Sequence, residues 1–393
     1  MPYVLLVFAA FGLLTSSVFA AIVLMAVPGY MRERRLAMAK AQTDAQAGFT
    51  PPLSLLKPLH GDEPGLESYL ESFFTQDYPA YEILFCTRDA SDPALAVARR
   101  ISNRYPHIST KFLVTNGQPN YINAKVASLE TMEHLASHEI LVISDSDVRV
   151  GPDYLRSIAL PFADPKVGGM CCLYRGVAAQ GGLWARLEAI GMSVEMTSGV
   201  LAARMMEGMR FTLGPTMAFR RETIQRMGGF GVTADFCADD FILGSETHKL
   251  GQKVVLSHYV IDHMVINAKL FDSLKHQIRW MKSTRFSRPK GHFGTVLTFA
   301  MPFALLGLAA GFWAHRPLWG IGLFAVGLAS RLALSFAVGR NVVGDTSWFG
   351  LLVLYPIRDL MGAIFWALSY FNSRILWRGQ IFQLLPGGKM RAA

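Results

Sequence analysis

The hydrophobic pattern divides the chain into two membrane-like ends and a middle region of alternating character. Residues 3–27 are almost entirely apolar and carry no charge, and about 20 such residues cross a bilayer as a helix. This pattern predicts a transmembrane helix over 1–28, followed by a basic linker over 29–50. A cleaved signal peptide is the alternative, but no basic segment precedes the apolar run, which is also too long.

The middle region contains short apolar runs of strand length, each followed by apolar residues at helical spacing. The runs at 53–56, 81–87 and 140–143 are rich in Val, Ile and Leu, which is typical of buried strands in a parallel sheet. The alternation of strands and helices predicts an α/β domain over 51–267, with a mostly parallel sheet covered by helices on both faces. No glycine-rich phosphate loop follows the first strand, which argues against a dinucleotide-binding or P-loop fold.

Two acidic residues, Asp145 and Asp147, come directly after the buried strand at 140–143. Ligands of open α/β sheets bind beyond the carboxyl ends of the strands. Two carboxylates so close together repel each other unless a cation lies between them. The pair therefore suits an oxygen-seeking cation, Mg²⁺ or Mn²⁺, that carries a phosphate. A polar turn after a core strand is the plain alternative.

Further acids stand at expected helix starts. Asp92 precedes Pro93, and both suit the first turn of a helix, so capping alone could explain Asp92. Asp239 and Asp240 precede another apolar helix, where negative charge interacts favourably with the helix dipole. The functional interpretation is that one of these two acids is a general base, because a carboxylate near other carboxylates and a metal can accept a proton from a hydroxyl.

A basic amphipathic segment is expected over 268–292. Its apolar residues recur at helical spacing, at Leu270, Leu274, Ile278 and Met281. Positive charge, as expected of a helix at a membrane surface, comes from Lys275, Arg279, Lys282, Arg285, Arg288 and Lys290. The segment contains the run His276-Gln277-Ile278-Arg279-Trp280.

Three apolar stretches occupy the expected C-terminal membrane region, at about 294–313, 318–338 and 348–371. If each of the three stretches in this region (293–373) crossed the membrane, the basic tail at 374–393 would lie outside the cytoplasm, against the positive-inside rule. Arg331, Arg358 and Asp359 also place charge inside apolar runs, which is costly unless they are paired or hydrated. We therefore expect the third stretch to be re-entrant or interfacial; three ordinary crossings is the alternative.

Charge and cysteine content indicate where in the cell the protein works and what kind of surface it contacts. The chain has a net charge of +9 and is 51% hydrophobic. Basic residues cluster beside the apolar stretches, which indicates a membrane surface rather than nucleic acid as the partner. Their position after the first stretch predicts that the α/β domain lies on the cytoplasmic side, and we expect the membrane to be a bacterial inner membrane. The four cysteines show neither metal-finger nor disulfide spacing and are expected to be free thiols.

Six short motifs occur in order between about residues 50 and 290: Lys57-Pro58-Leu59, Asp77-Tyr78-Pro79, Asp89-x-x-Asp92-Pro93-Ala94, Asp145-Ser146, Asp239-Asp240 and Arg279-Trp280. In order and spacing they resemble the motifs of ceramide glucosyltransferases, which are inverting membrane glycosyltransferases with a GT-A fold. The resemblance implies a GT-A-type nucleotide-sugar domain, a UDP-sugar donor, a divalent metal (Mn²⁺ or Mg²⁺) and a lipid acceptor, ceramide or similar.

The resemblance also implies a donor side of the site. The residues expected there are Asp92, Lys125, Asp145, Arg279 and Trp280. Asp92 would contact the uridine, and Asp145 with Asp147 would serve the metal. Arg279 and Trp280 would line the pyrophosphate and the acceptor side.

On the acceptor side, Asp240 would be the general base that deprotonates a lipid hydroxyl. Asp239, His276 and Gln277 are expected near it. The family usually has Gln or Arg four residues before the Trp, where this chain has His276, so either His276 takes over that contact or the substrate differs. Animal members of the family have a sequence like Asp-Ser-Gly where this chain has a full Asp-x-Asp, Asp145-Ser146-Asp147. This difference puts the details of metal ligation in question.

Other functions remain open from the sequence. A hopanoid or diacylglycerol could replace ceramide as acceptor, and galactose, glucuronic acid or N-acetylglucosamine could replace glucose. A processive polysaccharide synthase would share the acids and the Arg-Trp motif, but it needs enough crossings to form a channel. A non-enzymatic lipid-binding or scaffold protein would have no reason to retain acids at three strand ends.

Overall fold

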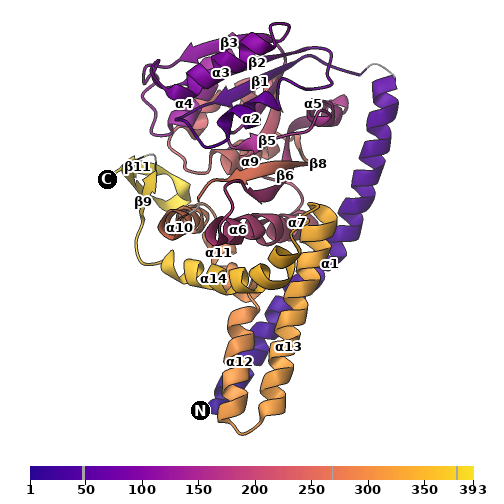
Figure 1. Cartoon of the computed structure of the whole chain (residues 1–393), viewed down its shortest axis with the longest axis vertical. Coiled ribbons are helices and arrows are strands. Elements are labelled where there is room, and N and C mark those ends of the chain that lie inside the picture. Colours follow the sequence, from indigo (N-terminus) through magenta and orange to yellow (C-terminus); the bar gives the residue numbers. More distant parts are fainter. Residues whose placement is uncertain (47–48, 268, 378) are drawn as a thin grey trace.

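The computed structural model describes residues 1–46, 49–267, 269–377 and 379–393. An α/β domain lies at one end of the molecule, and a bundle of long helices extends from it at the other (Figure 1). Helix α1 (Pro2–Gln46) runs along both parts. It continues as one helix beyond the apolar run because the residues that follow, rich in Ala, Arg, Lys and Met, favour helix. The expected linker is therefore helical up to Gln46, and its residues 47 and 48 lie outside the described residues.

An eight-stranded mixed sheet forms the centre of the α/β domain, in the order β3-β2-β1-β4-β7-β6-β8-β5. Its strands are β1 (Leu53–Pro58), β2 (Tyr81–Thr87), β3 (Ser109–Val114), β4 (Ile140–Ser144), β5 (Val148–Arg149), β6 (Val167–Ala178), β7 (Thr216–Arg220) and β8 (Lys253–Val265). The first four strands run parallel, and β6 and β8 are also parallel. The pairs β4–β7, β6–β7 and β5–β8 are antiparallel. The expected α/β class is confirmed, with a sheet that is parallel over its first half.

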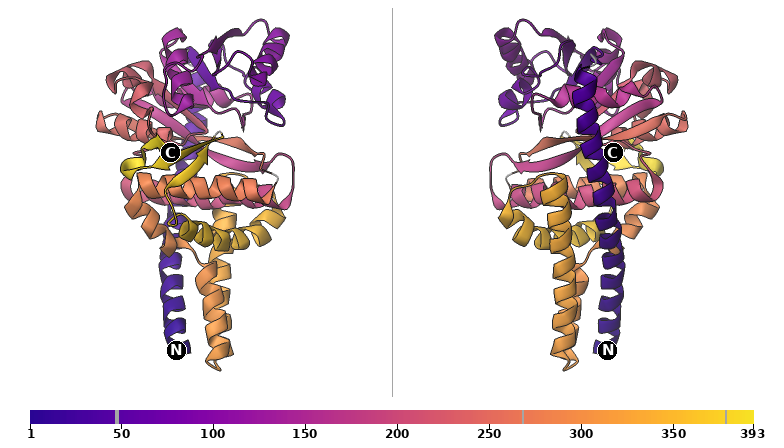
Figure 2. Two further views of the ribbon diagram at one scale, coloured as in Figure 1. Left: turned by 90° about the vertical axis from the view of Figure 1, so that its left-hand side faces the viewer. Right: turned by 90° about the vertical axis from the view of Figure 1, so that its right-hand side faces the viewer.

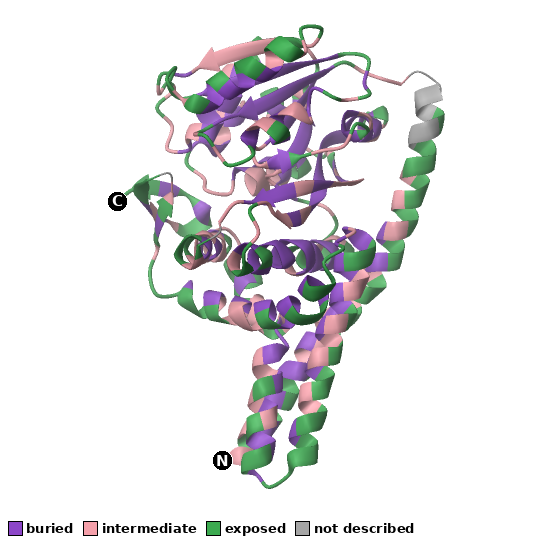
Figure 3. Cartoon of the chain, in the orientation of Figure 1, coloured by how far each residue is buried: buried purple, intermediate pink, exposed green. Residues whose placement is uncertain are grey.

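Burial follows the predicted pattern. Every residue of β1, β2 and β4 is buried, whereas β3 at the sheet edge is only partly covered (Figure 3). The domain's helices are α2 (Leu66–Glu71), α3 (Pro93–Arg104), α4 (Ala124–Leu135), α5 (Tyr154–Ala159), α6 (Leu183–Ile190), α7 (Thr197–Glu207), α8 (Arg221–Arg226) and α9 (Asp239–Lys249). Short 3₁₀ segments lie at Leu160–Ala163 and Phe230–Thr233, and a π-helical segment at Gly191–Met196 joins α6 to α7.

The basic segment forms helix α10 (Leu270–Ser287), and Pro289 begins the separate helix α11 (Pro289–Thr295). Proline suits a first helical position but cannot continue a helix, which explains the break. Residue 268, at the expected start of this segment, lies outside the described residues. In Figure 1, α10 lies between the sheet and the membrane-side helices.

Within the described ranges, three helices are long and apolar enough to cross a membrane: Pro2–Lys40, Pro317–Val342 and Gly350–Leu368. A pair bent by 43°, Pro289–Thr298 and Met301–Trp313, would count as a fourth. Within these segments lie α12 (Met301–Trp313), α13 (Pro317–Leu334) and α14 (Tyr355–Leu368), a 3₁₀ turn at Val296–Thr298, and π-helical segments at Ser335–Val342 and Gly350–Leu354. Helices α1, α12 and α13 run alongside one another, whereas α14 lies across them (Figures 1 and 2). The re-entrant or interfacial position predicted for the third apolar stretch stays a prediction, because Gly350–Leu368 is also long and apolar enough to cross a membrane.

The basic tail forms a small antiparallel sheet that the sequence analysis did not predict. Its strands are β9 (Arg374–Trp377), β10 (Gln380–Leu384) and β11 (Met390–Ala392), with a 3₁₀ turn at Pro386–Gly388. The amide of Met390 donates to the carbonyl of Asp235 at 2.6 Å, and the amide of Cys237 donates to that of Gly388 at 3.4 Å. The tail therefore lies against the α/β domain.

Candidate active site

The loops after β1 and β2 meet at the carboxyl edge of the sheet, because the two strands run parallel. The carboxylate of Asp92 joins them: it accepts from the Gly61 amide at 3.0 Å and from the Ala94 amide at 3.0 Å. The second bond caps α3, so the predicted capping role of Asp92 is present in the structure. His60 Nδ1 lies 3.5 Å from the same carboxylate. The uridine contact of Asp92 stays a prediction.

Lys125 lies where the end of β4 meets the start of α9. Its Nζ is 2.7 Å from Asp145 Oδ1 and 3.6 Å from Asp239 Oδ2. Asn123 sets this position, because its side chain caps α4 and also donates to the carbonyl of Phe236 at 3.0 Å. Burial works against the charge of Lys125, but Asp145 and Asp239 outweigh it and raise the pKa of Lys125 above its ordinary value.

Lys57 is a second buried cation at this edge. Its Nζ donates to the carbonyl of Asp145 at 2.6 Å and lies 3.8 Å from the centre of the Phe73 ring. Burial lowers the pKa of Lys57 to about 7, although Asp145 and Asp147 act in the opposite direction. In the sequence analysis Lys57 appeared only within a motif, and its contact with the end of β4 was not predicted.

Asp147 and Glu63 form the acidic half of the site. Asp147 Oδ2 lies 3.0 Å from His263 Nε2, and Glu63 accepts from the Ser146 hydroxyl at 3.0 Å. Desolvation and then the neighbouring Asp145 raise the pKa of Asp147 to about 7, while His276 opposes the rise. Desolvation and then Asp147 raise the pKa of Glu63 to about 7. A cation placed here would relieve this mutual repulsion.

The donor set fits a divalent metal bound together with a phosphate. Asp145 and Asp147 supply carboxylate oxygens, and Oδ1 of Asp147 is buried with no hydrogen-bond partner among the described residues. Over those same residues, no three His, Cys, Asp or Glu side chains converge as a ready-made metal site. Mg²⁺ bound at nucleotide sites usually takes one or two carboxylates and completes its shell with phosphate oxygens and water. The pair matches that arrangement.

The adjacent acids at the start of α9 have different surroundings. Asp239 is buried and faces Lys125. The carboxylate of Asp240 instead accepts from the Gly214 amide at 2.7 Å and from the Phe241 amide at 2.8 Å. Desolvation and then the neighbouring Asp239 raise the pKa of Asp240 to about 6. Asp240 is thus a rigidly held carboxylate of raised basicity, whereas Asp239 belongs to the Lys125 cluster.

Helix α10 carries the remaining predicted residues. The His276 ring packs on the Trp280 ring with centroids 4.3 Å apart, and His276 Nδ1 lies 2.7 Å from Glu188 Oε1. The guanidinium of Arg279 lies 5.9 Å from the ring centre of Trp377, so the small C-terminal sheet helps to hold it.

Gln277 is placed differently from its neighbours on α10. It is buried, and its amide donates to the Ser273 hydroxyl at 2.9 Å. Four residues of these networks, Lys57, Glu63, Glu188 and His263, carried no assigned role in the sequence analysis. Glu63 follows the first strand, at the edge of the sheet where ligands bind, and that position was a signal that the sequence offered.

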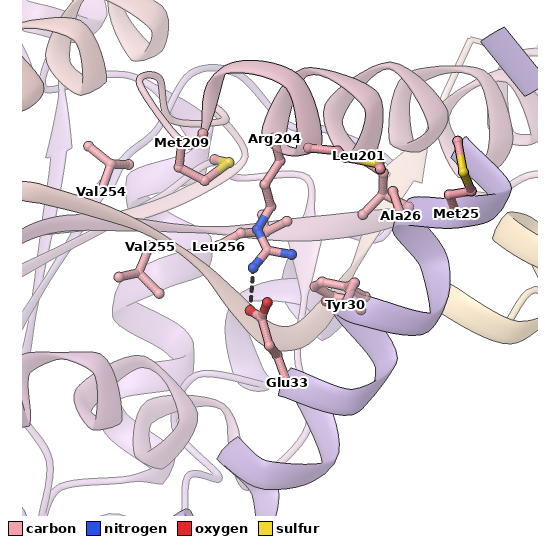
Figure 4. Close-up of a pocket in the computed structure, with 13 residues that line it drawn as sticks. Met25, Ala26, Tyr30, Glu33, Leu201, Arg204, Met209, Val254, Val255 and Leu256 are labelled. Carbon is pink, nitrogen blue, oxygen red and sulfur yellow. Dashed lines mark hydrogen bonds and ion pairs between the residues drawn. The ribbon is translucent and has the colours of Figure 1, made fainter. Parts of the chain in front are cut away.

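A groove of about 580 Å³ lies elsewhere, between α1, α7 and β8 (Figure 4). Met25, Leu201 and Val255 contribute to its apolar walls. Arg204 and Glu33 form an ion pair across it. None of the predicted site residues lines this groove.

Comparison with known proteins gives a family match over almost the whole chain. The model described as Glycosyl transferase family 21 matches residues 13–390. Ceramide glucosyltransferase 3 of Caenorhabditis elegans is 22% identical over 366 residues, covering 86% of this chain and 74% of that protein. Ceramide glucosyltransferase of Komagataella phaffii is 34% identical over 101 residues, covering 25% of this chain and 20% of that protein.

Among solved structures, the mannosyltransferase PcManGT from Pyrobaculum calidifontis, in complex with GDP-Man and Mn²⁺, is similar to this chain. The TM-score is 0.48 with 19% sequence identity, over 88% of this chain and 99% of that chain. The glucosyl-3-phosphoglycerate synthase from Mycobacterium tuberculosis, in complex with Mn²⁺, UDP-glucose and phosphoglyceric acid, gives a TM-score of 0.41 with 19% identity, over 62% of this chain and 81% of that chain.

Proposed function

The chain belongs to glycosyl transferase family 21, and from that premise we propose that this membrane glycosyltransferase moves glucose from UDP-glucose to the hydroxyl of ceramide or a similar lipid. The observation that carries the proposal is the cluster around Lys125, where the acids after β4 meet the acids that begin α9. The relatives named ceramide glucosyltransferases support the choice of sugar and lipid.

On the donor side, Asp145 and Asp147 would hold a divalent ion together with the diphosphate. When bound, the ion would supply positive charge that stabilises the departing UDP. Lys125 would add fixed positive charge beside it, and by resemblance Arg279 would add more; such pre-placed electrostatics commonly supply the largest catalytic contribution. By resemblance to the family, Asp92 would contact the uridine; a carboxylate has about four acceptor positions, and its two amide partners leave room for such a contact.

On the acceptor side, Asp240 would take the proton of the lipid hydroxyl. The hydroxyl oxygen forms a bond to the anomeric carbon while the bond from that carbon to the UDP oxygen breaks on the opposite face. This single displacement inverts the anomeric centre, so an α-linked donor gives a β-glycoside. Two amide hydrogen bonds fix the carboxylate, and its raised pKa makes it a stronger base than an exposed aspartate.

The membrane parts would present the lipid headgroup to this site. We propose that α1, α12 and α13 cross the bilayer and that α14 lies at its cytoplasmic face. The tail supports this topology, because it packs on the α/β domain and the chain must therefore return to the domain's side. Exposed apolar side chains on α1 and the α12–α13 hairpin would contact lipid: Phe8, Phe11, Leu14, Phe312 and Leu318.

The test is mass spectrometry of the lipids made by purified protein offered several UDP-sugars and several lipid alcohols. Ceramide, diacylglycerol and a hopanoid alcohol cover the acceptor alternatives, and UDP-glucose, UDP-galactose, UDP-glucuronic acid and UDP-N-acetylglucosamine cover the donors. We expect a β-glucosylceramide as the main product. Long saccharide chains would point to a processive synthase, and no product with any pair would contradict the proposal.

A further inference from the structure

The small C-terminal sheet contacts three parts of the chain that carry proposed site residues. Its buried side chains form a hydrophobic cluster that is separate from the main core: Ile375, Phe382, Leu384 and Met390. Three of the partly buried side chains packed on this cluster come from distant segments, and they are Ile122, Cys237 and Phe286. Ile122 lies just before α4, Cys237 lies just before α9, and Phe286 lies on α10. The sheet therefore connects the loops before α4 and α9 to α10.

The loop before α9 is held from two sides. On one side, the side-chain amide of Asn123 donates to the carbonyl of Phe236 at 3.0 Å. On the other side, Lys389 of the tail pairs with Phe236 in an antiparallel bridge. The backbone amide of Met390 also donates to the carbonyl of Asp235 at 2.6 Å. Because this loop leads directly into the two acids that begin α9, the tail helps to set where these acids lie.

The same sheet also holds α10. Lys282 is buried, and its Nζ donates to Asn372 Oδ1 at 2.6 Å and to the carbonyl of Arg374 at 2.9 Å. The turn before β11 packs on the end of α10 at Gly388, where φ is +86° and an added Cβ would clash with Ser287. Glycine suits both this backbone conformation and this close approach. The helix that carries the Arg-Trp motif is therefore fixed to the tail at two points.

We propose that the C-terminal sheet is a positioning element for catalysis, with Met390 as the residue that joins its small core to the loop before α9. By tying this loop to α10, the sheet keeps the proposed base Asp240 in place relative to the Arg279 helix. A displacement of about 1 Å in a reacting group can cost about a hundredfold in rate. This inference rests on the proposed function, since it assigns the sheet to the same reaction.

The test uses full-length protein in detergent and perturbs the sheet in two independent ways. Met390→Ala leaves a cavity in the small cluster, and Gly388→Ala forces the turn away from α10. Met390→Leu nearly keeps the side-chain volume and is the rescue variant. Arg391→Ala is the matched control, because Arg391 is an exposed neighbour on β11 whose guanidinium donates to Gln383 of the same sheet.

Three quantities are measured for each variant: kcat with UDP-glucose and ceramide, UDP affinity in Mn²⁺ by calorimetry, and amide hydrogen exchange by mass spectrometry. Met390→Ala and Gly388→Ala should lower kcat about 10- to 100-fold, because the base is misplaced. UDP affinity should change about threefold or less, because Asp92 and the acids after β4 remain anchored at the main sheet. Amide exchange should rise over residues 234–240 and in α10, but not in β1 or β4.

Met390→Leu and Arg391→Ala should behave as the wild type in all three measurements. The inference is overturned if both perturbing variants keep wild-type kcat, or if amide exchange of the loop before α9 stays unchanged in both. A loss of kcat matched by an equal loss of UDP affinity and by faster exchange in β1 and β4 would mean that the sheet serves the fold alone. These results leave the proposed function standing, because the wild type is active. A wild type that makes no glycolipid from any donor and acceptor would overturn the proposed function together with this inference.

Discussion

Two groups of buried charge lie in this molecule, and they differ in how completely they are balanced. On the membrane side, Arg331 pairs with Asp359 at 2.8 Å and Arg358 pairs with Glu195 at 3.1 Å. The second oxygen of Asp359 accepts from the amides that start α12, at residues 300 and 301. Two cations meet two anions, and one anion also caps a helix. This network pins α13 and α14 to the start of α12.

The cluster at the carboxyl edge of the sheet is not balanced in this way. The two lysines, Lys57 and Lys125, meet five carboxyl groups, those of Glu63, Asp145, Asp147, Asp239 and Asp240. Three of these acids have raised pKa values. The contrast shows that burial of charge alone does not mark a site. The balanced group holds helices together, whereas the group with excess negative charge is the one at which we propose that a divalent cation binds.

Removal of the proposed base should have the largest effect. Asp240→Asn keeps the size of the side chain but removes the proton acceptor, so turnover should fall about 10²–10⁴-fold. UDP-sugar binding should be nearly unchanged, because Asp92, the metal pair and Arg279 are the residues proposed to hold the donor. Asp239→Asn should be milder. Turnover and donor binding are measured for both variants; a normal rate for Asp240→Asn beside an inactive Asp239→Asn that still binds donor would exchange their roles.

Loss of one acid should affect stability in opposite ways in the two clusters. Asp359→Ala leaves Arg331 buried without its partner, which should cost about 3–5 kcal/mol of stability. Asp147→Asn removes a repelled charge and should leave stability unchanged or raise it at pH 8. Thermal unfolding in detergent compares the two variants. A similar loss in both would mean that the site acids also serve mainly to hold the fold.

The pH dependence of stability should reveal the unbalanced cluster. Glu63 and Asp147 have pKa values raised from 4.5 and 3.8 to about 7, so their contribution is full below about pH 4 and is lost as the pH rises toward 7. The pKa of Lys57 is lowered from 10.5 to about 7, so its contribution is full above about pH 10.5 and is lost as the pH falls toward 7.

These groups together predict a stability minimum near pH 7 in metal-free protein. Melting temperatures measured in chelator from pH 5 to 9 test this. Asp147→Asn should flatten the acid side of the minimum, and Lys57→Met the alkaline side. A melting temperature that changes in one direction over the whole range would count against the assigned pKa shifts.

The smallest structural effect is expected at Asp92. Asn caps a helix about as well as Asp, so Asp92→Asn should change stability by only about 0.5 kcal/mol or less. UDP affinity should nevertheless fall if the carboxylate contacts the uridine. Calorimetry with UDP and a melting curve separate the two roles. Unchanged affinity would mean that Asp92 only caps α3 and accepts the hydrogen bond from the Gly61 amide.

Much of this arrangement could be predicted from the sequence. Short runs of β-branched and other apolar residues predicted the buried strands. Long apolar stretches near the two ends of the chain predicted the membrane helices. Asp145 and Asp147 could be placed at the sheet edge, because a parallel strand must end where its neighbours end. The capping of α3 by Asp92 followed from its place before Pro93.

The parts that went unpredicted depend on contacts between distant segments. Glu188 meets His276 across 88 positions, and Lys57 meets Asp145 across 88. No local pattern encodes such pairs. The small C-terminal sheet was missed because its strands are only three to five residues long and rest on the loop before α9. The different surroundings of Asp239 and Asp240 also depend on tertiary partners, Lys125 and Gly214.

The central claim is that the acid-rich edge around Lys125 binds a divalent ion together with a nucleotide diphosphate. The most direct measurement is calorimetric titration of UDP into purified full-length protein with Mn²⁺ and, in parallel, with excess chelator. We expect clear binding with Mn²⁺, strong weakening in chelator, and the same weakening in Asp147→Asn even when Mn²⁺ is present. Equal UDP affinity in Mn²⁺ and in chelator would contradict the account.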